Sequence, residues 1–365
     1  MRHFRKAAAC AVVGLSGYAL AGVGAAEAQQ SVADFYAGKR VNVVIGYGPG
    51  GGYDQYARVF ARHMGEYIPG KPTLVPQAMP GAGSRKAANW LYNVAPKDGT
   101  TIAMLGQNTA TDQALKAEGV QFDVRKFYWI GNMVVVNNTL AVWHTSGVKT
   151  IEEATKKSLN IGGTGAASPS VIYPQVANNL LGTRFKIIAG YPGGGDVNLA
   201  MERGELDGRG SNSWASWKST QADWLKEKKV HILFQVGPKR EPDLPDVPLL
   251  TELAKTPEQK KVFEVLSADV SVGRPFLTTP GVPAERVAAL RKAFDDTIAS
   301  KSFLADAEKL KMDISPMSGV DLQKIVTETV EMPDEIIALV KSAIQIRDME
   351  ALAPEKGGVS PDGGN

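Results

Sequence analysis

The segment VVIGYGPGGGYD, residues 43–54, decides the fold of this chain. Its apolar start leads into a turn of glycine and proline, and apolar residues at helical spacing follow directly. Continuous apolar runs are typical of strands that are buried on both faces of a sheet, and glycine permits the backbone conformations of a tight turn. The segment therefore predicts a strand at 41–45, a glycine-rich turn and a helix at 53–67, which together open a βαβ unit.

Short apolar strands and amphipathic helices keep alternating after this segment, in two blocks. Strands are also expected at 73–77 and 101–105 in the first block, and at 139–144, 159–162, 185–189 and 231–236 in the second. Helices are expected at 85–92, 151–157, 170–181 and 197–203, and, after a proline-rich crossing at 237–248, at 284–300, 303–310 and 321–346. This order predicts an α/β protein, with a largely parallel sheet in the first block.

The first 28 residues have the three parts of a secretory signal peptide. Arg2, Arg5 and Lys6 precede an apolar run, and the small-residue site Ala26-Glu27-Ala28 follows it. Cys10, the only cysteine, lies in this segment, so the mature chain would hold no disulfide, thiolate metal site or cysteine nucleophile. No later stretch approaches the roughly 20 apolar residues of a membrane span. We therefore expect an exported, periplasmic protein without a stable membrane anchor.

Charge and composition argue against several classes of function. The 365 residues carry a net charge of +3, and without the signal segment 38 basic residues face 37 acidic ones. Nucleic acid is therefore not expected as a partner, because neutralisation of phosphates supplies most of that affinity. The remaining histidines, His63, His144 and His231, are far apart in sequence and form no His-x-x-x-His pair. We expect no metal, no cofactor and no catalytic residue.

Three glycine-rich turns join a strand to a helix. They lie at 46–54, at 162–168 (GGTGAAS) and at 191–196 (YPGGGD). Backbone N–H groups of such turns point into a concavity, and the first turn of the following helix adds free N–H groups and a partial positive charge. Because the turns are shared between the two blocks, they predict one cleft for a carboxylate or a phosphate at a domain interface.

The first turn also fits a dinucleotide-binding fingerprint. Gly46-x-Gly48-x-x-Gly51 has the required spacing, but that fingerprint needs an acidic residue about 20 positions on, at the end of the second strand. The expected second strand at 73–77 is followed by Ala78-Met79-Pro80. The missing acid argues against a nucleotide site.

Several motifs of the chain resemble the Bug-type (TctC-like) solute receptors of tripartite tricarboxylate transporters. The similarity covers roughly residues 34–345. It is carried by Gly48-Pro49-Gly50-Gly51-Gly52-Tyr53-Asp54 with Ala57-Arg58, by Pro80-Gly81-Ala82-Gly83, Ala95-Pro96-Lys97-Asp98-Gly99-Thr100, residues 162–168, Gly190-Tyr191-Pro192-Gly193-Gly194, Arg203-Gly204-Glu205-Leu206-Asp207 and Leu244-Pro245-Asp246-Val247-Pro248. Departures include Tyr47, where the family often has Phe, and Tyr173 or a neighbour, where it has His.

The resemblance implies a two-domain periplasmic-binding-protein fold, type II-like, with a ligand cleft between the domains. We expect a signal peptide at 1–28, a discontinuous domain 1 at 29–135 and 240–352, domain 2 at 136–239 and a flexible tail at 353–365. In such receptors two loops hold a ligand carboxylate through backbone N–H groups and ordered waters. The expected ligand-binding residues are Tyr47, Gly50, Gly51, Gly52, Tyr53, Asp54, Asn108, Thr164, Gly165, Ser168, Tyr191 and Asp207.

The expected function is capture of a small organic carboxylate, either a di- or tricarboxylate or an aromatic acid, by a monomer. The expected partners are integral-membrane transporter subunits. Two alternatives stay open: an exported nucleotide-dependent enzyme that uses the glycine-rich cleft, and a receptor that feeds a sensor kinase. For Trp214 and Trp217, contact with the ligand and packing beneath a loop are equally expected.

Overall fold

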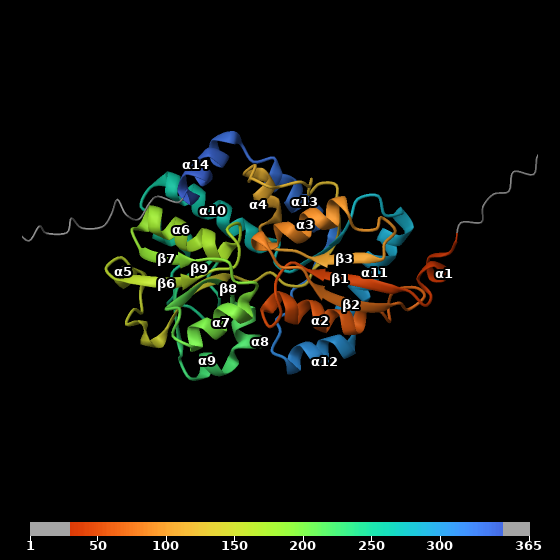
Figure 1. The fold of residues 1–365 in the computed structure, drawn as a ribbon, viewed down its shortest axis with the longest axis horizontal. Coiled ribbons are helices and arrows are strands. Elements are labelled where there is room, and N and C mark those ends of the chain that lie inside the picture. Colours follow the sequence, from red (N-terminus) through yellow and green to blue (C-terminus); the bar gives the residue numbers. More distant parts are fainter. Residues whose placement is uncertain (1–29, 346–365) are drawn as a thin grey trace, which may run out of the picture. The chain divides into compact units, whose positions relative to one another are not determined.

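Two β-sheets organise the chain, and the computed structural model describes residues 30–345 (Figure 1). The first sheet has the strand order β11-β4-β10-β3-β1-β2. Its strands are β1 (Arg40–Ile45), β2 (Thr73–Ala78), β3 (Thr101–Met104), β4 (Tyr128–Asn132), β10 (Pro275–Thr278) and β11 (Met317–Ser318). The expected signal peptide at 1–28 and the expected tail at 353–365 lie outside the described residues.

The second sheet has the order β7-β6-β8-β5-β9. Its strands are β5 (Asn138–Trp143), β6 (Ser158–Gly162), β7 (Arg184–Ile188), β8 (Gly208–Ser213) and β9 (Val230–Val236). The α/β class and all seven expected strands are confirmed. The strands expected in the first block do pair in parallel, β1 with β2 and with β3. Both sheets are nevertheless mixed and not largely parallel, because β10 runs antiparallel to β3 and β4, and β5 runs antiparallel to β8 and β9.

Helices cover both faces of each sheet (Figure 1). Around the first sheet lie α1 (Val32–Tyr36), α2 (Gly52–Met64), α3 (Arg85–Asn93), α4 (Thr109–Ala114), α11 (Ala284–Ala299), α12 (Lys301–Lys309) and α13 (Gly319–Val330). Around the second lie α5 (Ile151–Ala154), α6 (Pro169–Leu181), α7 (Gly194–Glu202), α8 (Trp214–Thr220), α9 (Ala222–Lys226), α10 (Pro257–Ala268) and α14 (Asp334–Ile344). Within residues 30–345, four short 3₁₀ turns complete the elements: η1 (Ala82–Ser84), η2 (His144–Ser146), η3 (Leu250–Leu253) and η4 (Asp269–Ser271).

Strand β1 shows why apolar runs become central strands here. Val41, Val43 and Ile45 pack in one core with α2 and α11, whereas Val44 packs in the core on the opposite face. Successive side chains of a strand point to opposite faces, so the consecutive apolar residues Val43, Val44 and Ile45 contribute to both cores.

The helix expected at 321–346 is two helices, which corrects the prediction. Helix α13 ends at Val330, and α14 begins at Asp334, directly after Pro333. Proline has no N–H to donate, and its ring clashes with the preceding turn, so a helix cannot run through this position without a kink. Proline is tolerated at a helix start, where the N–H would have no partner inside the helix.

Strand β8 escapes the sequence patterns because its sequence, GRGSNS, is polar although every residue in it is buried. A Cβ on Gly210 would lie 2.0 Å from the carbonyl oxygen of Ser170 in α6. Glycine at this position therefore lets α6 pack directly on the strand. The strand then carries polar side chains into the interior, where apolar periodicity cannot reveal them.

Helices α10 and α14 lie beside the second sheet, although residues 240–352 are predicted to belong to domain 1. Helix α10 contacts β9, and α14 contacts α6 and α10. Phe263 and Val340 from these helices join the core that contains Leu140 and Phe234 of the second sheet. The domain boundaries themselves stay a prediction.

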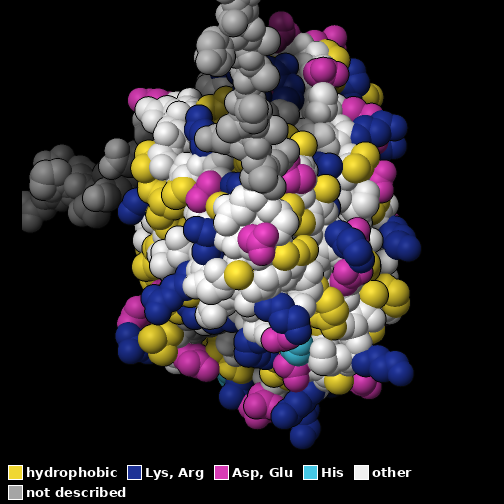
Figure 2. All heavy atoms as spheres, turned by 90° about the vertical axis from the view of Figure 1, so that its right-hand side faces the viewer, with side chains coloured by type: hydrophobic (Ala, Val, Ile, Leu, Met, Phe, Trp, Pro, Cys, Tyr) yellow, Lys and Arg dark blue, Asp and Glu magenta, His cyan; other side chains and the backbone are white. Residues whose placement is uncertain are grey.

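Lysine, arginine and acidic side chains are interspersed on the face seen in Figure 2, outside the grey atoms. Among the described residues, charged side chains form exposed or partly exposed ion pairs, such as Arg240 with Glu252 at 2.7 Å. Surface pairs of this kind contribute little to stability. These exposed pairs differ from the buried arginines in the interior, which are described below.

Candidate functional site between the two sheets

Sheet topology brings glycine-rich loops to one edge of the first sheet. The loop after β1 and residues Gly106 and Gln107 after β3 both follow carboxyl ends of parallel strands. Strand β10 runs in the opposite direction, with Phe276 paired to Met104. Arg274, the residue directly before β10, therefore lies at the same edge. Ligands of α/β proteins bind at this edge.

The second sheet repeats the arrangement. Gly162 of β6 pairs with Arg209 of the parallel strand β8, and Asn138 of the antiparallel strand β5 pairs with Ser213. The loop after β6, the end of β8 and the start of β5 therefore meet at one edge, where Thr164 and Arg209 reach the same space.

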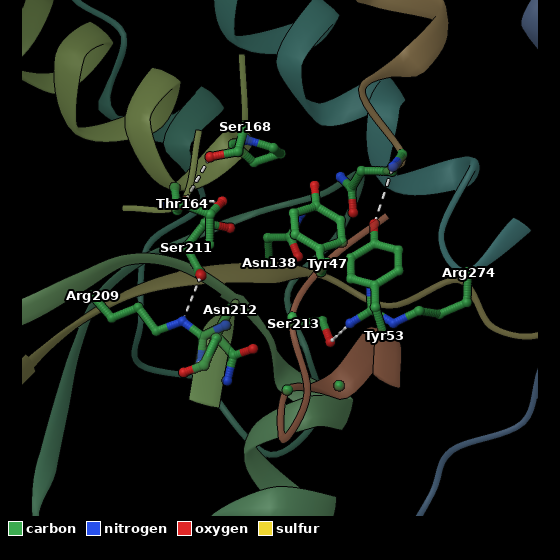
Figure 3. A pocket seen from close by; sticks show the side chains of 17 residues that line it. Tyr47, Tyr53, Asn138, Thr164, Ser168, Arg209, Ser211, Asn212, Ser213 and Arg274 are labelled. Atoms are coloured by element: carbon green, nitrogen blue, oxygen red, sulfur yellow. Dashed lines mark hydrogen bonds between the residues drawn. The ribbon is translucent and has the colours of Figure 1, made fainter. Parts of the chain in front are cut away.

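A cavity of about 60 Å³, which we call the inter-sheet cavity, lies where these edges meet (Figure 3). It is smaller than the roughly 150 Å³ cavity that holds benzene in an engineered protein, so it suits a molecule of few atoms. Its lining contains two arginines and no Asp or Glu. The lining residues are Tyr47, Gly48, Gly51, Gly52, Tyr53, Gln107, Asn138, Thr164, Ser168, Pro169, Ser170, Gly194, Arg209, Ser211, Asn212, Ser213 and Arg274.

Three helices of eight or more residues begin at the inter-sheet cavity. Gly52, Pro169 and Gly194 are the first residues of α2, α6 and α7, and all three line the cavity. Helix N-termini carry free N–H groups and a partial positive charge. In the first turn of α6, the Ser170 hydroxyl accepts a hydrogen bond from the backbone N–H of Thr164 at 3.0 Å, and a shared hydroxyl contact of 2.7 Å links it to Ser168.

Asp54 fixes the glycine-rich loop from within. Its carboxylate accepts hydrogen bonds from the backbone N–H of Gly50 at 3.1 Å and from Nε of Arg58 at 2.6 Å. Gly50 has φ +78°, a left-handed conformation that favours glycine. Neither Gly50 nor Asp54 is among the lining residues of the cavity, so their role in this structure is to shape the loop that carries Gly51 and Gly52.

Tyr47, Tyr53 and Arg274 form a stack along one wall. The two tyrosine rings lie 4.5 Å apart between centroids, and Cζ of Arg274 lies 3.9 Å from the Tyr53 ring centroid. The Tyr53 hydroxyl accepts from the backbone N–H of Gln107 at 3.0 Å and donates to the carbonyl of Gly273 at 3.3 Å. Burial raises the pKa of Tyr47 well above its usual value, so this hydroxyl stays neutral.

The two arginines are buried on opposite walls. Arg274 is 4% exposed and donates through Nη2 to the hydroxyls of Ser213 and Ser216, each at 2.8 Å. Arg209 is 8% exposed and donates to Asn198 Oδ1 at 2.9 Å and to the carbonyl of Ser211 at 3.0 Å. Burial, and next the positive charge of Arg274, lower the pKa of Arg209 to about 9, which leaves it charged at neutral pH.

Loops of the two sheets touch each other beside the cavity. The backbone N–H of Gly48 donates to the carbonyl of Pro192 at 2.8 Å, and Asn108 Nδ2 donates to the carbonyl of Ala167 at 2.9 Å. Next to this contact is a second hollow of about 230 Å³. It is lined by Tyr47, Pro80, Gly81, Ala82, Gly83, Thr164, Gly165, Gly190, Tyr191 and Pro192.

The predicted site residues divide into four groups in the structure. Six line the inter-sheet cavity: Tyr47, Gly51, Gly52, Tyr53, Thr164 and Ser168. Gly165 and Tyr191 line the second hollow, and Gly50, Asp54 and Asn108 hold the loops in place. Asp207 lies at the opposite end of β8, where its carboxylate accepts from the backbone N–H of Asn160 at 2.8 Å.

The predicted site residues did not include Gln107, which follows β3, or the polar residues that β5, β8 and the start of β10 supply, namely Asn138, Arg209, Ser211, Asn212, Ser213 and Arg274. Trp214 and Trp217, which were undecided, lie outside the lining of both hollows. Trp214 donates to Asp243 at 2.8 Å, and Trp217 donates to Thr139 at 2.8 Å. The only signal in the sequence that points to Arg209 is the polar segment at 207–213, which glycines interrupt.

Within residues 30–345, no cluster of three His, Cys, Asp or Glu side chains has the arrangement of a metal site. In the same range, no helix has the length and apolar character needed to cross a bilayer.

Comparisons with known proteins agree with this geometry. A curated relative, "UPF0065 protein in gbd 5'region" of Cupriavidus necator, is 26% identical over 348 residues, which are 92% of this chain and 96% of the relative. The structure of the periplasmic binding protein BugD matches with a TM-score of 0.68 at 20% identity, over 84% of this chain and 98% of BugD. MatC of Rhodopseudomonas palustris, solved with bound malate, matches with a TM-score of 0.65 at 21% identity, over 82% and 99% of the two chains.

The structural matches confirm the expected two-domain periplasmic-binding-protein fold. A sequence profile with the description "Tripartite tricarboxylate transporter family receptor" matches residues 56–341, most of the chain. The chain therefore belongs to the family of solute receptors of the tripartite tricarboxylate transporters.

Proposed function

We propose that this receptor captures a small organic carboxylate in the inter-sheet cavity. The observation that carries the proposal is the chemistry of the lining, which has two buried arginines, three helix N-termini and no acidic side chain. Buried charges are costly unless they are paired, so a site of this composition favours an anion. The malate in the related MatC supports a carboxylate as that anion.

Binding would use hydrogen-bond donors that the fold already directs into the cavity. Backbone N–H groups at Gly51 and Gly52 and at the start of α6 need no reorganisation, because Asp54 and Ser170 hold their loops. Preorganised donors lower the entropic cost of binding. Asn108 crosses between the loops of the two sheets, so its hydrogen bond to Ala167 would strengthen the form in which the ligand is enclosed.

The transport role extends this proposal beyond the cavity. Residues 1–28 would direct export to the periplasm, and the receptor would deliver its ligand, as a monomer, to integral-membrane subunits of a tripartite tricarboxylate transporter. Ligand binding would shift the population toward the closed form that those subunits recognise. No chemical conversion of the ligand is part of this role, so we propose a receptor and not an enzyme.

A thermal-shift screen of the purified protein tests the proposal. The probes are mono-, di- and tricarboxylates, aliphatic and aromatic, with nucleotides as a separate class. We expect a saturable rise in Tm with a short acid, because a ligand at 100 times its Kd stabilises the folded state by about 2.7 kcal/mol. A rise with nucleotides alone would replace the receptor by a nucleotide-dependent enzyme.

A further inference from the structure

Arg209 and Arg274 are the only buried arginines among residues 30–345. Neither forms an ion pair within 4.0 Å with an acidic side chain of that range. Arg85, which is also largely inaccessible to solvent, is paired with an acidic side chain, because its Nε lies 3.1 Å from a carboxylate oxygen of Asp112. Two buried positive charges without a counter-charge are unfavourable for folding unless something else supplies the negative charge.

Both guanidinium groups also sit where a helix is positive. Nη2 of Arg209 lies 2.2 Å from the point that a Cβ on Gly194, the first residue of α7, would occupy. Nη2 of Arg274 lies 3.2 Å from the corresponding point on Gly52, the first residue of α2. Cations are stabilised at helix C-termini and destabilised at N-termini, so these positions add to the positive potential of the cavity.

Several hydrogen-bond donors of the lining lack an acceptor. Within the described part of the chain, Nε of Arg274, Nε2 of Gln107 and Nδ2 of Asn212 are buried and have no partner. Each of these residues is less than 9% exposed. Gln107 and Arg274 belong to the first sheet's edge, and Asn212 stands beside Arg209 on the second. Acceptors are therefore missing on both walls.

The two arginines face each other across the cavity. Figure 3 shows them entering from opposite sides, with their guanidinium groups directed inward. Arg274 is held against the Tyr53 ring at 3.9 Å, and Arg209 lies 5.6 Å from the Trp217 ring centroid. These ring contacts and the hydrogen bonds to Ser213 and Asn198 fix both positions.

We propose that Arg209 and Arg274 select ligands with two negative charges, one carboxylate for each guanidinium. The inference rests on the proposed carboxylate receptor and adds its charge specificity. A monoanion would leave one buried guanidinium without a counter-charge, whereas a dianion neutralises both. Because the arginines come from different sheets, a dianion also bridges the two walls. The small volume of the cavity favours short diacids.

Isothermal titration calorimetry tests this selection with matched ligands. Malonate, succinate, glutarate and malate are each compared with the monoamide of the same acid, which keeps the size and removes one charge. We expect every diacid that binds to bind at least about 30-fold more tightly than its monoamide, since leaving one partner of a buried charge pair unpaired carries a large penalty.

Variants assign the selection to the two arginines. Arg209→Met and Arg274→Met should each weaken diacid binding and bring the ratio of diacid to monoamide affinity close to one. Arg203→Met, at a mostly exposed arginine at the end of α7, serves as the control and should leave the ratio unchanged. Where one variant does not fold, the other variant tests the assignment, and the ligand comparison on the unaltered protein tests the charge selection itself.

The outcomes separate the two proposals. Equal affinity for diacids and monoamides, or binding of monocarboxylates alone, would overturn the charge selection and keep the carboxylate receptor. No binding of any acid would overturn the receptor proposal, and the selection with it. A strong diacid preference that survives both arginine substitutions would overturn the assignment to Arg209 and Arg274.

Discussion

Gly165 offers the most direct test of whether the loops of the two sheets must touch when the ligand is bound. A Cβ at this position would lie 2.0 Å from the backbone nitrogen of Gly83 and 2.5 Å from the carbonyl carbon of Ala82. These atoms belong to backbone, which cannot turn away as a flexible side chain can. Gly165→Ala therefore places one methyl group between the loop after β6 and the loop that contains η1.

The size of the effect follows from these distances. Real Cβ atoms are essentially never found within 3.0 Å of another heavy atom, so the loops must separate by about 1 Å, the difference between 3.0 and 2.0 Å. Overpacking of this kind costs about 1–3 kcal/mol. If the free protein escapes the clash by opening, the whole cost falls on the enclosed form, and the affinity drops by about 5- to 150-fold.

Calorimetry with the acid found in the screen measures the change in affinity, and thermal unfolding without ligand measures the change in stability of the free protein. Ala166→Ser is the matched control, because it adds one heavy atom to the same loop at an exposed position. We expect Gly165→Ala to lose affinity with little change in the ligand-free Tm, and Ala166→Ser to change neither. Wild-type affinity in Gly165→Ala would refute the idea that these loops must approach for binding.

Three further substitutions probe the loop at Gly50, the buried carboxyl group of Asp269 and the packing of α6 on β8. Asp54→Ala removes the acceptor of the Gly50 N–H, and we expect a loss of about 1.5–3 kcal/mol in the free energy of unfolding, measured with urea, together with weaker acid binding. Burial raises the pKa of Asp269 to about 7 from the 3.8 of the unfolded chain, so stability should fall as pH rises from about 4 to 7. Asp269→Asn should remove up to roughly 4 kcal/mol of that dependence in melts between pH 4 and 8, and an unchanged pH profile would contradict the assignment. Gly210→Ala forces a methyl group against the carbonyl of Ser170, so the urea midpoint should fall by the equivalent of about 1–3 kcal/mol.

Sequence patterns were sufficient to locate strands and turns wherever the conformation depends on neighbouring residues alone. Continuous apolar runs located central strands such as β1, because both faces of each strand are buried. Glycine-rich turns located the loops at 46–54 and 162–168, since their backbone must form an unhindered concavity before a helix. The same motifs carried the family resemblance, which the profile match over residues 56–341 confirmed.

Tertiary structure alone decided which side chains complete the site. Arg274 precedes a short apolar strand, and only the antiparallel entry of β10 beside β3 brings it to the loop after β1. Arg209 lies in a polar strand that no hydrophobic period marks, and its place depends on the register with Gly162. Asp207, only two residues earlier, comes directly before the strand, and its carboxylate accepts from the backbone N–H of Asn160 instead of lining the cavity. The local sequence determines which segments form strands, turns and helices. The direction and the register of strand pairing determine which distant residues share a cavity, and the local sequence pattern specifies neither of the two.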